Sequence, residues 1–305
     1  SSDLYELVNL TVDGLKGGHS GADIHLPRAN AIKLVARILM ACISAGCEMS
    51  LTSWNGGNKT NAIPRACLAS FLIKKTEHEK ITMIINEEMQ KIKEYYIKYE
   101  PELKFDLKTE LIKEMPSLFS DILTKNIIET VSIIPSGPIV MSPEVSGFVE
   151  TSNNVGIIST ENRNIKIRSM PRSSKDHELE YWCRIIAACG EIGGGRAKIG
   201  KGHSGWIPDP QNPLLNEILP YYTLQYSQDL QIGIISSNEE AEVKFNAIHA
   251  GLECGIIAAK IKGLNCISVG PTILNLHSPL EKVFVPSVES LYKILKNYLL
   301  RRMGA

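Results

Sequence analysis

The stretch "LYELVNLTVDGLKGGHSGADIHLPRANAIKLVARILMACISAG", residues 4–46, decides the fold prediction. Residues 4–15 alternate apolar and polar side chains, which is the pattern of a half-buried β-strand. After a glycine-rich segment, residues 30–46 place apolar side chains at helical spacing and end at Gly46, a residue common after the last turn of a helix. A strand, a turn and an amphipathic helix in direct succession predict an α/β (α+β) protein.

The remainder of the chain continues to alternate strand and helix patterns. We predict strands at 66–75 and 264–270, two strands around a turn at 162–164, and helices at 77–99, 175–192, 214–227, 250–261 and 285–303. The segment 193–213 is rich in glycine and proline, which is typical of a domain boundary. The sequence therefore predicts a first domain over residues 1–200, with a helical insertion around 77–150, and a second over residues 201–305.

The composition excludes several classes of protein. The chain has 305 residues, of which 44% are hydrophobic, enough for a substantial core. Its 33 lysines and arginines balance 33 acidic residues, so no net charge attracts nucleic acid or an anionic membrane. It has no apolar run of about 18 residues, and residues 1–10 lack the pattern of a secretory signal. We expect neither a nucleic-acid partner nor a membrane partner.

The seven cysteines favour a reducing compartment. Their number is odd, they are scattered, and no CxxC motif occurs. This pattern argues against a disulfide framework and against a cysteine zinc knuckle. We therefore expect a cytoplasmic protein.

The glycine-rich segment "GLKGGHSGADIH" leaves several interpretations open. It contains neither GxGxxG nor a phosphate-binding P-loop. His19 and His25 are six residues apart and flanked by glycines, so they would not share one face of a helix. A metal site formed by this pair is therefore a weak interpretation. A tight turn with an incidental histidine is the simplest one. The glycines nevertheless leave room for a close ligand, which would suit His19 as a hydrogen-bond donor to a developing oxyanion.

Four further positions could carry chemistry, each with a structural alternative. Glu253 lies near a predicted helix start whose backbone N–H groups could hold a carboxylate, although a helix cap explains it equally well. His277 follows a predicted strand, where metal ligands and structural histidines both occur. Arg168 ends a strand and could bind a carboxylate with two hydrogen bonds, or form a surface ion pair. The acidic pair Glu239–Glu240 is expected to be solvated.

Six separated blocks together resemble the zinc aminoacylase and dipeptidase family of metallopeptidases. They occur in the family's order and cover nearly the whole chain, which makes the set far more specific than any single block. The blocks are "GLKGGHSGADIH" (14–25), "NGGNKTNAIPR" (55–65), "VETSNNVGII" (149–158), "GWIPDPQNP" (205–213), "IHAGLECG" (248–255) and "SVGPTILNLHSPLE" (268–281).

The resemblance implies a fold and a reaction. Residues 1–200 would form a two-layer sheet-and-helix lid and dimerisation domain, and residues 201–305 part of an α/β catalytic domain. The family hydrolyses dipeptides with a metal-activated water, and the blocks are most similar to enzymes that cleave aminoacyl-histidine dipeptides. His19 resembles the lid histidine that stabilises the oxyanion. Asn61, Asn154 and Arg168 resemble lid residues that hold the substrate.

The resemblance also predicts what the catalytic segment contributes. Gly251 and Glu253 match a block that meets the substrate end, and His277 matches a position that binds metal. Two zinc ions are implied, and each needs about three protein ligands. The family's HxD motif and glutamate base are not found in residues 1–305. We therefore expect most zinc ligands to lie outside this chain, and the chain alone, as a fragment, to be inactive.

Two alternatives to this dipeptidase interpretation follow from the motifs, which do not specify the substrate side chain. The first is another activity of the same family, such as an aminoacylase or a tripeptidase. The second is a non-catalytic binding or assembly module that lacks the metal-binding half. The expected partners are a dipeptide substrate and a second copy of the chain, bound through the lid.

Overall fold

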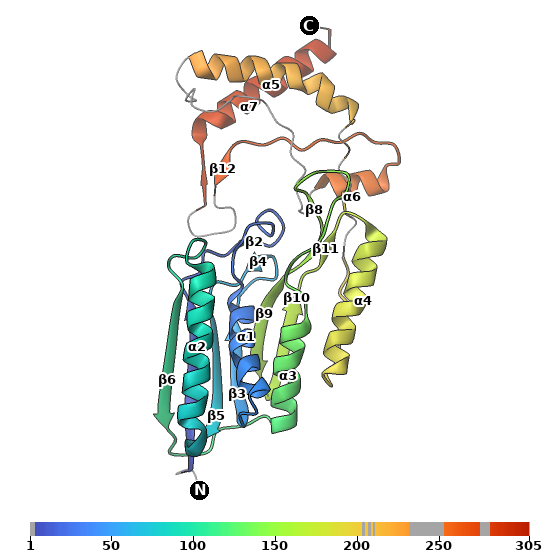
Figure 1. Cartoon of the computed structure of the whole chain (residues 1–305). Coiled ribbons are helices and arrows are strands. Elements are labelled where there is room, and N and C mark those ends of the chain that lie inside the picture. Colours follow the sequence, from blue (N-terminus) through green and yellow to red (C-terminus); the bar gives the residue numbers. More distant parts are fainter. Residues whose placement is uncertain are drawn as a thin grey trace. The chain divides into compact units, whose positions relative to one another are not determined.

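The computed structural model describes residues 4–202, 205–206, 209, 211–231, 253–274 and 281–304 (Figure 1). Its contacts divide the chain into two compact units. The first consists of Ser1–Ser173 and His177–Lys201, and the second of Ser174–Asp176 and Gly202–Ala305. Both units contain helices and strands, so the predicted mixed α/β class is confirmed.

The first unit is built on a six-stranded sheet with the order β10-β9-β3-β5-β1-β6, in which neighbouring strands are antiparallel. Two small sheets accompany it, one with the order β11-β8-β7 and one that pairs β2 with β4. The strands are β1 (Tyr5–Asp13), β2 (Gly18–His19), β3 (Met49–Gly56), β4 (Ala62–Ile63), β5 (Cys67–Lys74), β6 (Lys104–Leu111), β7 (Gly137–Met141), β8 (Val149–Asn153), β9 (Val155–Glu161), β10 (Asn164–Ser169) and β11 (Arg172–Ser173).

Helices cover one face of the six-stranded sheet, as Figure 1 shows for α1 to α4. Their apolar faces contribute Ile38, Ile85 and Ile128 to the same buried cluster as the strands, and Ile186 packs against it. The first unit is thus a layer of helices on a layer of sheet. The helices are α1 (Ala31–Ser44), the short 3₁₀ helix η2 (Lys75–Glu77), α2 (His78–Tyr96), α3 (Asp121–Ile133) and α4 (Asp176–Ile192).

The strand pattern at the start of the chain explains the centre of the sheet. In β1, Val8, Leu10 and Val12 are at most 2% exposed, whereas the residues between them are half-buried. Val8 lies opposite Phe71 of β5, and Leu10 lies opposite Ala69. Because side chains alternate between the two faces of a strand, this register places all of these apolar groups under the helices.

The helix α1 begins where the sequence provides a cap. The Asn30 side chain accepts hydrogen bonds from the N–H groups of Ile32 (3.0 Å) and Lys33 (3.3 Å). Such an N-cap satisfies backbone donors that have no partner inside the helix. The helix ends at Ser44, and Gly46 follows with a φ of +72°. Both ends lie close to the predicted ones.

The predicted helical insertion at 77–150 is only partly helical. It contains α2 and α3, but also the strands β6 and β7. β6 forms an edge of the main sheet and pairs with β1, with Leu107 opposite Leu10 and Phe105 opposite Val12. Its other side chains are mostly charged and exposed, as edge strands often are. That charge obscured the alternation in the sequence.

The second unit is described in separate pieces. It contains α5 (Pro213–Gln231), α6 (Glu253–Lys260), α7 (Val285–Arg302), and a hairpin of β12 (Ile273–Leu274) with β13 (Lys282–Val283). The helices α5 and α7 contact each other, with the Tyr221 and Tyr298 rings 5.8 Å apart, centroid to centroid. The predicted strand at 264–270 is wrong, since those residues form no strand in the described part of the chain.

Candidate functional site

The glycine turn that carries His19 is paired with the segment that carries Asn61. Gly18 lies opposite Ile63 and His19 opposite Ala62 in the β2–β4 ladder. The N–H of Ser20 donates to the Asn61 carbonyl at 2.8 Å. Two predicted site segments, far apart in the sequence, therefore lie side by side through backbone hydrogen bonds.

The imidazole of His19 is held in one tautomer. The ring is buried, and its Nδ1 accepts hydrogen bonds from the N–H groups of Gly21 (3.2 Å) and Ala22 (3.0 Å). A nitrogen that accepts hydrogen bonds carries no proton, so the neutral ring bears its proton on Nε2. The His19 N–H donates to Asp23 Oδ2 at 2.8 Å, which fixes the turn itself. The local backbone thus prepares His19 as a donor through Nε2–H. His25, by contrast, is exposed, and it contributes no hydrogen bond to this turn.

The loop before Asn61 requires a close approach between two backbones. Gly57 has a φ of +68°, in the left-handed region that favours glycine. A Cβ at this position would lie 1.9 Å from the carbonyl oxygen of Gly156 in β9. Both glycines belong to blocks that the sequence singled out, and their role here is to let this loop lie against the sheet.

Asn154 is fully buried and bonded to the same loop. Its Nδ2 donates to the carbonyl of Thr60 (2.9 Å) and to that of Ala62 (2.8 Å). Its Oδ1 accepts a longer hydrogen bond, 3.4 Å, from Asn30 Nδ2. Both N–H groups of the amide are therefore occupied by the backbone opposite His19. This geometry favours a positioning role for Asn154 over direct contact with a substrate.

Arg168 lies apart from these hydrogen bonds. It is on β10, an edge strand of the main sheet, opposite Ile157, and its side chain is exposed. Among the described residues, it forms no hydrogen bond or ion pair. Its guanidinium has no internal partner there, which is compatible with the predicted role in ligand binding.

Of the predicted site residues in the second unit, Glu253 lies in the described part of the chain. Glu253 is the first residue of α6 and is exposed. A Cβ on Gly255, two residues along the helix, would lie 3.1 Å from the Trp206 side chain. Gly251 and His277 lie outside the described residues, so their predicted roles stay predictions.

A buried polar strand next to the His19 turn was missed by the sequence interpretation. In β8, Glu150 is 6% exposed, and Thr151, Ser152 and Asn153 are completely buried. Val149, at the start of the strand, packs with Ile24 and with Ile63 of β4. The signal was available in "VETSNN", where consecutive polar residues replace the alternation of a one-sided strand.

The described residues do not form a zinc shell by themselves. Within residues 4–202, 205–206, 209, 211–231, 253–274 and 281–304, no three His, Cys, Asp or Glu side chains gather where they could hold a metal ion. A catalytic zinc needs about three protein ligands. Any zinc bound by this protein would therefore need ligands from residues other than these.

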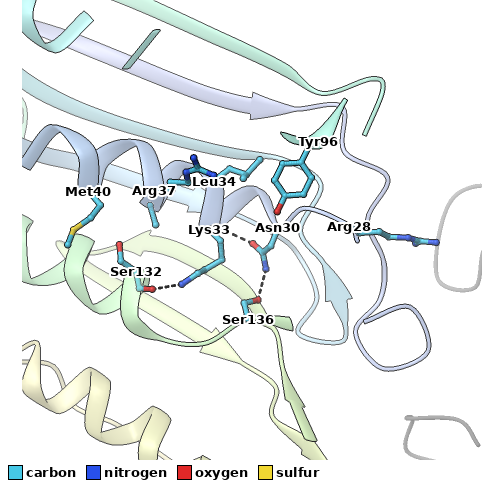
Figure 2. Close-up of a pocket in the computed structure, with 10 residues that line it drawn as sticks. Arg28, Asn30, Lys33, Leu34, Arg37, Met40, Tyr96, Ser132 and Ser136 are labelled. Carbon is cyan, nitrogen blue, oxygen red and sulfur yellow. Dashed lines mark hydrogen bonds between the residues drawn. The ribbon is translucent and has the colours of Figure 1, made fainter. Parts of the chain in front are cut away.

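A separate cavity of about 410 Å³ lies between α1, α2 and the end of α3, and Figure 2 shows the residues that line it. Its polar groups are already used by the fold. Lys33 Nζ donates to the carbonyls of Val131 (2.6 Å), Ser132 (2.7 Å) and Ile134 (2.7 Å), at the C-terminal end of α3. Arg37 pairs with Glu88 at 2.6 Å. These polar side chains therefore connect the helices around the cavity, and we assign the cavity no ligand.

Lys33 makes the stability of the first unit depend on pH in a specific direction. Burial lowers the pKa of Lys33 from 10.5 to about 8. Between these two values the unfolded chain binds the proton and the folded chain does not, so stability rises with pH. We expect the free energy of unfolding of the wild type, relative to Lys33→Met, to be flat below pH 8 and to increase from about pH 8 to 10.5. Urea unfolding at a series of pH values measures this, and a difference that falls in this window would contradict it.

Comparison with known proteins shows where this architecture occurs. Residues 10–100 match the family model of the peptidase dimerisation domain. The cytosol non-specific dipeptidase of Escherichia coli is 30% identical over 301 residues, which cover 97% of this chain and 58% of that protein. The crystal structure of the aminoacylhistidine dipeptidase from Vibrio alginolyticus matches with a TM-score of 0.75 and 30% identity, over 98% of this chain and 58% of that one.

The chain thus spans a little over half the length of these two dipeptidases. No described helix is long and apolar enough to cross a membrane. The resemblance inferred from the six sequence blocks is confirmed over nearly the whole chain. The chain is therefore similar in sequence and fold to these two dipeptidases, and its residues 10–100 match the model of the peptidase dimerisation domain.

Proposed function

We propose that the complete protein containing this chain is a metal-dependent dipeptidase that cleaves aminoacyl-histidine dipeptides. The observation that carries the proposal is the backbone-fixed tautomer of His19, with Nδ1 bonded to Gly21 and Ala22. A hydrogen-bond donor fixed before the substrate arrives stabilises a developing oxyanion without reorganisation. The similarity to two dipeptidases over nearly the whole chain supports the same reaction.

In this proposal the chain's residues have distinct tasks. His19 Nε2–H donates to the oxygen of the scissile carbonyl as negative charge develops there. Asn61 and Asn154 hold the strand opposite His19, and Arg168 binds the substrate carboxylate. Bound zinc supplies an activated water. Gly251 and Glu253 are proposed to meet the substrate end, and His277 is proposed as one metal ligand.

The location and assembly follow from the same comparisons. We propose a cytoplasmic enzyme, as the name of the E. coli relative and the seven free thiols suggest. We also propose a homodimer formed through the first unit, because residues 10–100 match a dimerisation domain. This same match supports the second candidate, an assembly module without catalysis.

The test is an assay of the complete purified protein on four substrates, before and after removal of metal by a chelator. These are a histidine dipeptide, a dipeptide without histidine, a tripeptide and an N-acyl amino acid. The proposal predicts zinc-restored turnover that is fastest with the histidine dipeptide. Turnover of the tripeptide or N-acyl amino acid alone would support another family activity, and no turnover of any substrate would support the assembly module.

Replacing Arg168 separates binding from chemistry. We expect Arg168→Ala to raise KM by about tenfold for a dipeptide with a free carboxylate, with little change in kcat, because a charge-assisted hydrogen bond is lost in both ground and transition states. Steady-state kinetics on the dipeptide and on its C-terminal carboxamide measure this. An equal rise in KM for both substrates would contradict the assigned role.

A further inference from the structure

A buried carboxylate, that of Glu100, connects the two ends of the segment that carries His19. Glu100 follows α2 in the chain and is 2% exposed. Its Oε2 accepts a hydrogen bond from the N–H of Lys16 at 2.8 Å, and its Oε1 accepts one from the N–H of Ala29 at 3.0 Å. One side chain thus joins both ends of the segment 16–29, which contains the His19 turn.

These two backbone groups are the hydrogen-bond partners of the Glu100 carboxylate. Among the residues that the structure describes, no Lys, Arg or His side chain lies within ion-pair distance of it. A buried charge is costly without partners, and hydrogen bonds to a carboxylate are roughly twice as strong as those between neutral groups. The carboxylate therefore binds both ends of the segment, and its own burial depends on those ends staying in place.

The backbone after α2 also lies directly against the start of this segment. Gly14 has a φ of +78°, in the left-handed region that favours glycine. A Cβ at Gly14 would lie 1.9 Å from the carbonyl oxygen of Glu102, so this approach requires glycine. The contact does not involve the Glu100 side chain. It therefore shows independently that the turn which supplies Glu100 is packed beside the segment.

The ends of the segment are also held by the backbone next to β4. The N–H of Leu15 donates to the Arg65 carbonyl at 3.4 Å, and that of Ala31 donates to the Pro64 carbonyl at 3.1 Å. The strand β4 in turn pairs with β2, which contains His19. Glu100 therefore adds a side-chain anchor to a set of backbone anchors, and, unlike them, it can be removed by substitution.

We propose that Glu100 is a positioning residue for His19, because its carboxylate holds both ends of the segment that places the imidazole. The inference rests on the proposed dipeptidase function for the part that His19 plays. Fixing both ends of a loop removes conformational freedom from the groups inside it. An oxyanion donor held in this way does not have to be ordered as the transition state forms, which favours catalysis.

The anchoring is tested by hydrogen exchange on the complete protein, which needs no turnover. In Glu100→Gln the side chain keeps its size, but its amide nitrogen is a donor and cannot accept from an N–H group. At least one end of the segment is then released, so we expect amide exchange in peptides from residues 16–29 to become about tenfold faster or more. The matched control, Glu102→Gln, changes an exposed glutamate of the same turn and should leave this exchange as it is in the wild type.

The link to His19 is tested by kinetics on a histidine dipeptide. Glu100→Gln is expected to lower kcat by about tenfold to a hundredfold and to change KM by less than about threefold, because a misplaced catalytic group slows the chemical step. In the His19→Ala background the same substitution should lower kcat by less than about twofold, since the group that it positions is gone. A loss caused only by general destabilisation would be the same in both backgrounds.

The outcomes separate this inference from the proposed function. Unchanged exchange in residues 16–29 would overturn the inference, and so would an equal loss of kcat in both backgrounds. If Glu100→Gln does not fold, Glu100→Asp, which is one methylene group shorter, must show the faster exchange and the background-dependent loss, or the inference fails. A protein that cleaves no dipeptide, but exchanges faster over residues 16–29 in Glu100→Gln, would contradict only the proposed function and would support the anchoring. Dipeptide cleavage that Glu100→Gln leaves unaffected would contradict only this inference.

Discussion

Replacement of His19 by alanine is expected to reduce the kcat of the complete protein on a histidine dipeptide by about 10² or more. The loss of one preorganised oxyanion donor typically has an effect of this size. The imidazole is buried, and Gly21 and Ala22 fix its tautomer, so the substitution removes a donor that is oriented before the substrate binds. KM should change little, because the interaction strengthens only as the transition state forms.

The matched control is His25→Ala, since His25 is an exposed histidine of the same segment. It should leave kcat within about twofold of the wild type, as substitutions at exposed positions usually do. Thermal unfolding of both variants checks that the turn is intact. An unchanged kcat in folded His19→Ala would remove His19 from the mechanism.

Asn154→Ala is expected to lower the free energy of unfolding by about 2–4 kcal/mol, because it removes the three hydrogen bonds of a fully buried amide. The carbonyls of Thr60 and Ala62 would each lose a donor, and the Asn30 amide would lose an acceptor. The strand opposite His19 would also lose its anchor, so we expect kcat to fall as well.

Urea unfolding of residues 1–305 measures this loss, with Asn58→Ala as the control. Asn58 is an exposed asparagine of the same loop, and its replacement should change stability by less than about 0.5 kcal/mol. If Asn154→Ala were as stable as Asn58→Ala, the hydrogen bonds of Asn154 would not be what holds this loop.

The sequence predicted the fold best where one face of an element is buried. The alternation in β1 and the apolar stripe of α1 both reflect burial against a single neighbouring layer. The strand β6 was missed, because an edge strand buries few side chains and its charges dominate the pattern. The strand predicted at 264–270 is the opposite kind of error, a strand that was predicted but does not form. A short apolar run does not by itself indicate a neighbouring strand with which it could pair.

The candidate site was predicted in its residues but not in its contacts. His19, Asn61 and Asn154 could be selected by their motifs, and the structure brings their segments together. Asn154 donates a hydrogen bond to the backbone carbonyl of Ala62, which lies 92 residues away in the sequence. Local sequence patterns do not encode such a long-range contact, so this partner could not be predicted.

The most direct test of the central claim is to compare how His19→Ala binds a substrate and a tetrahedral transition-state mimic. The complete protein is titrated with a histidine dipeptide under non-hydrolysing conditions and with a phosphinic analogue of the same dipeptide. If His19 stabilises the oxyanion, the variant should bind the phosphinate about 10² times more weakly and the dipeptide within about threefold of the wild type. Equal weakening of the two ligands, or no weakening of the phosphinate, would contradict the account.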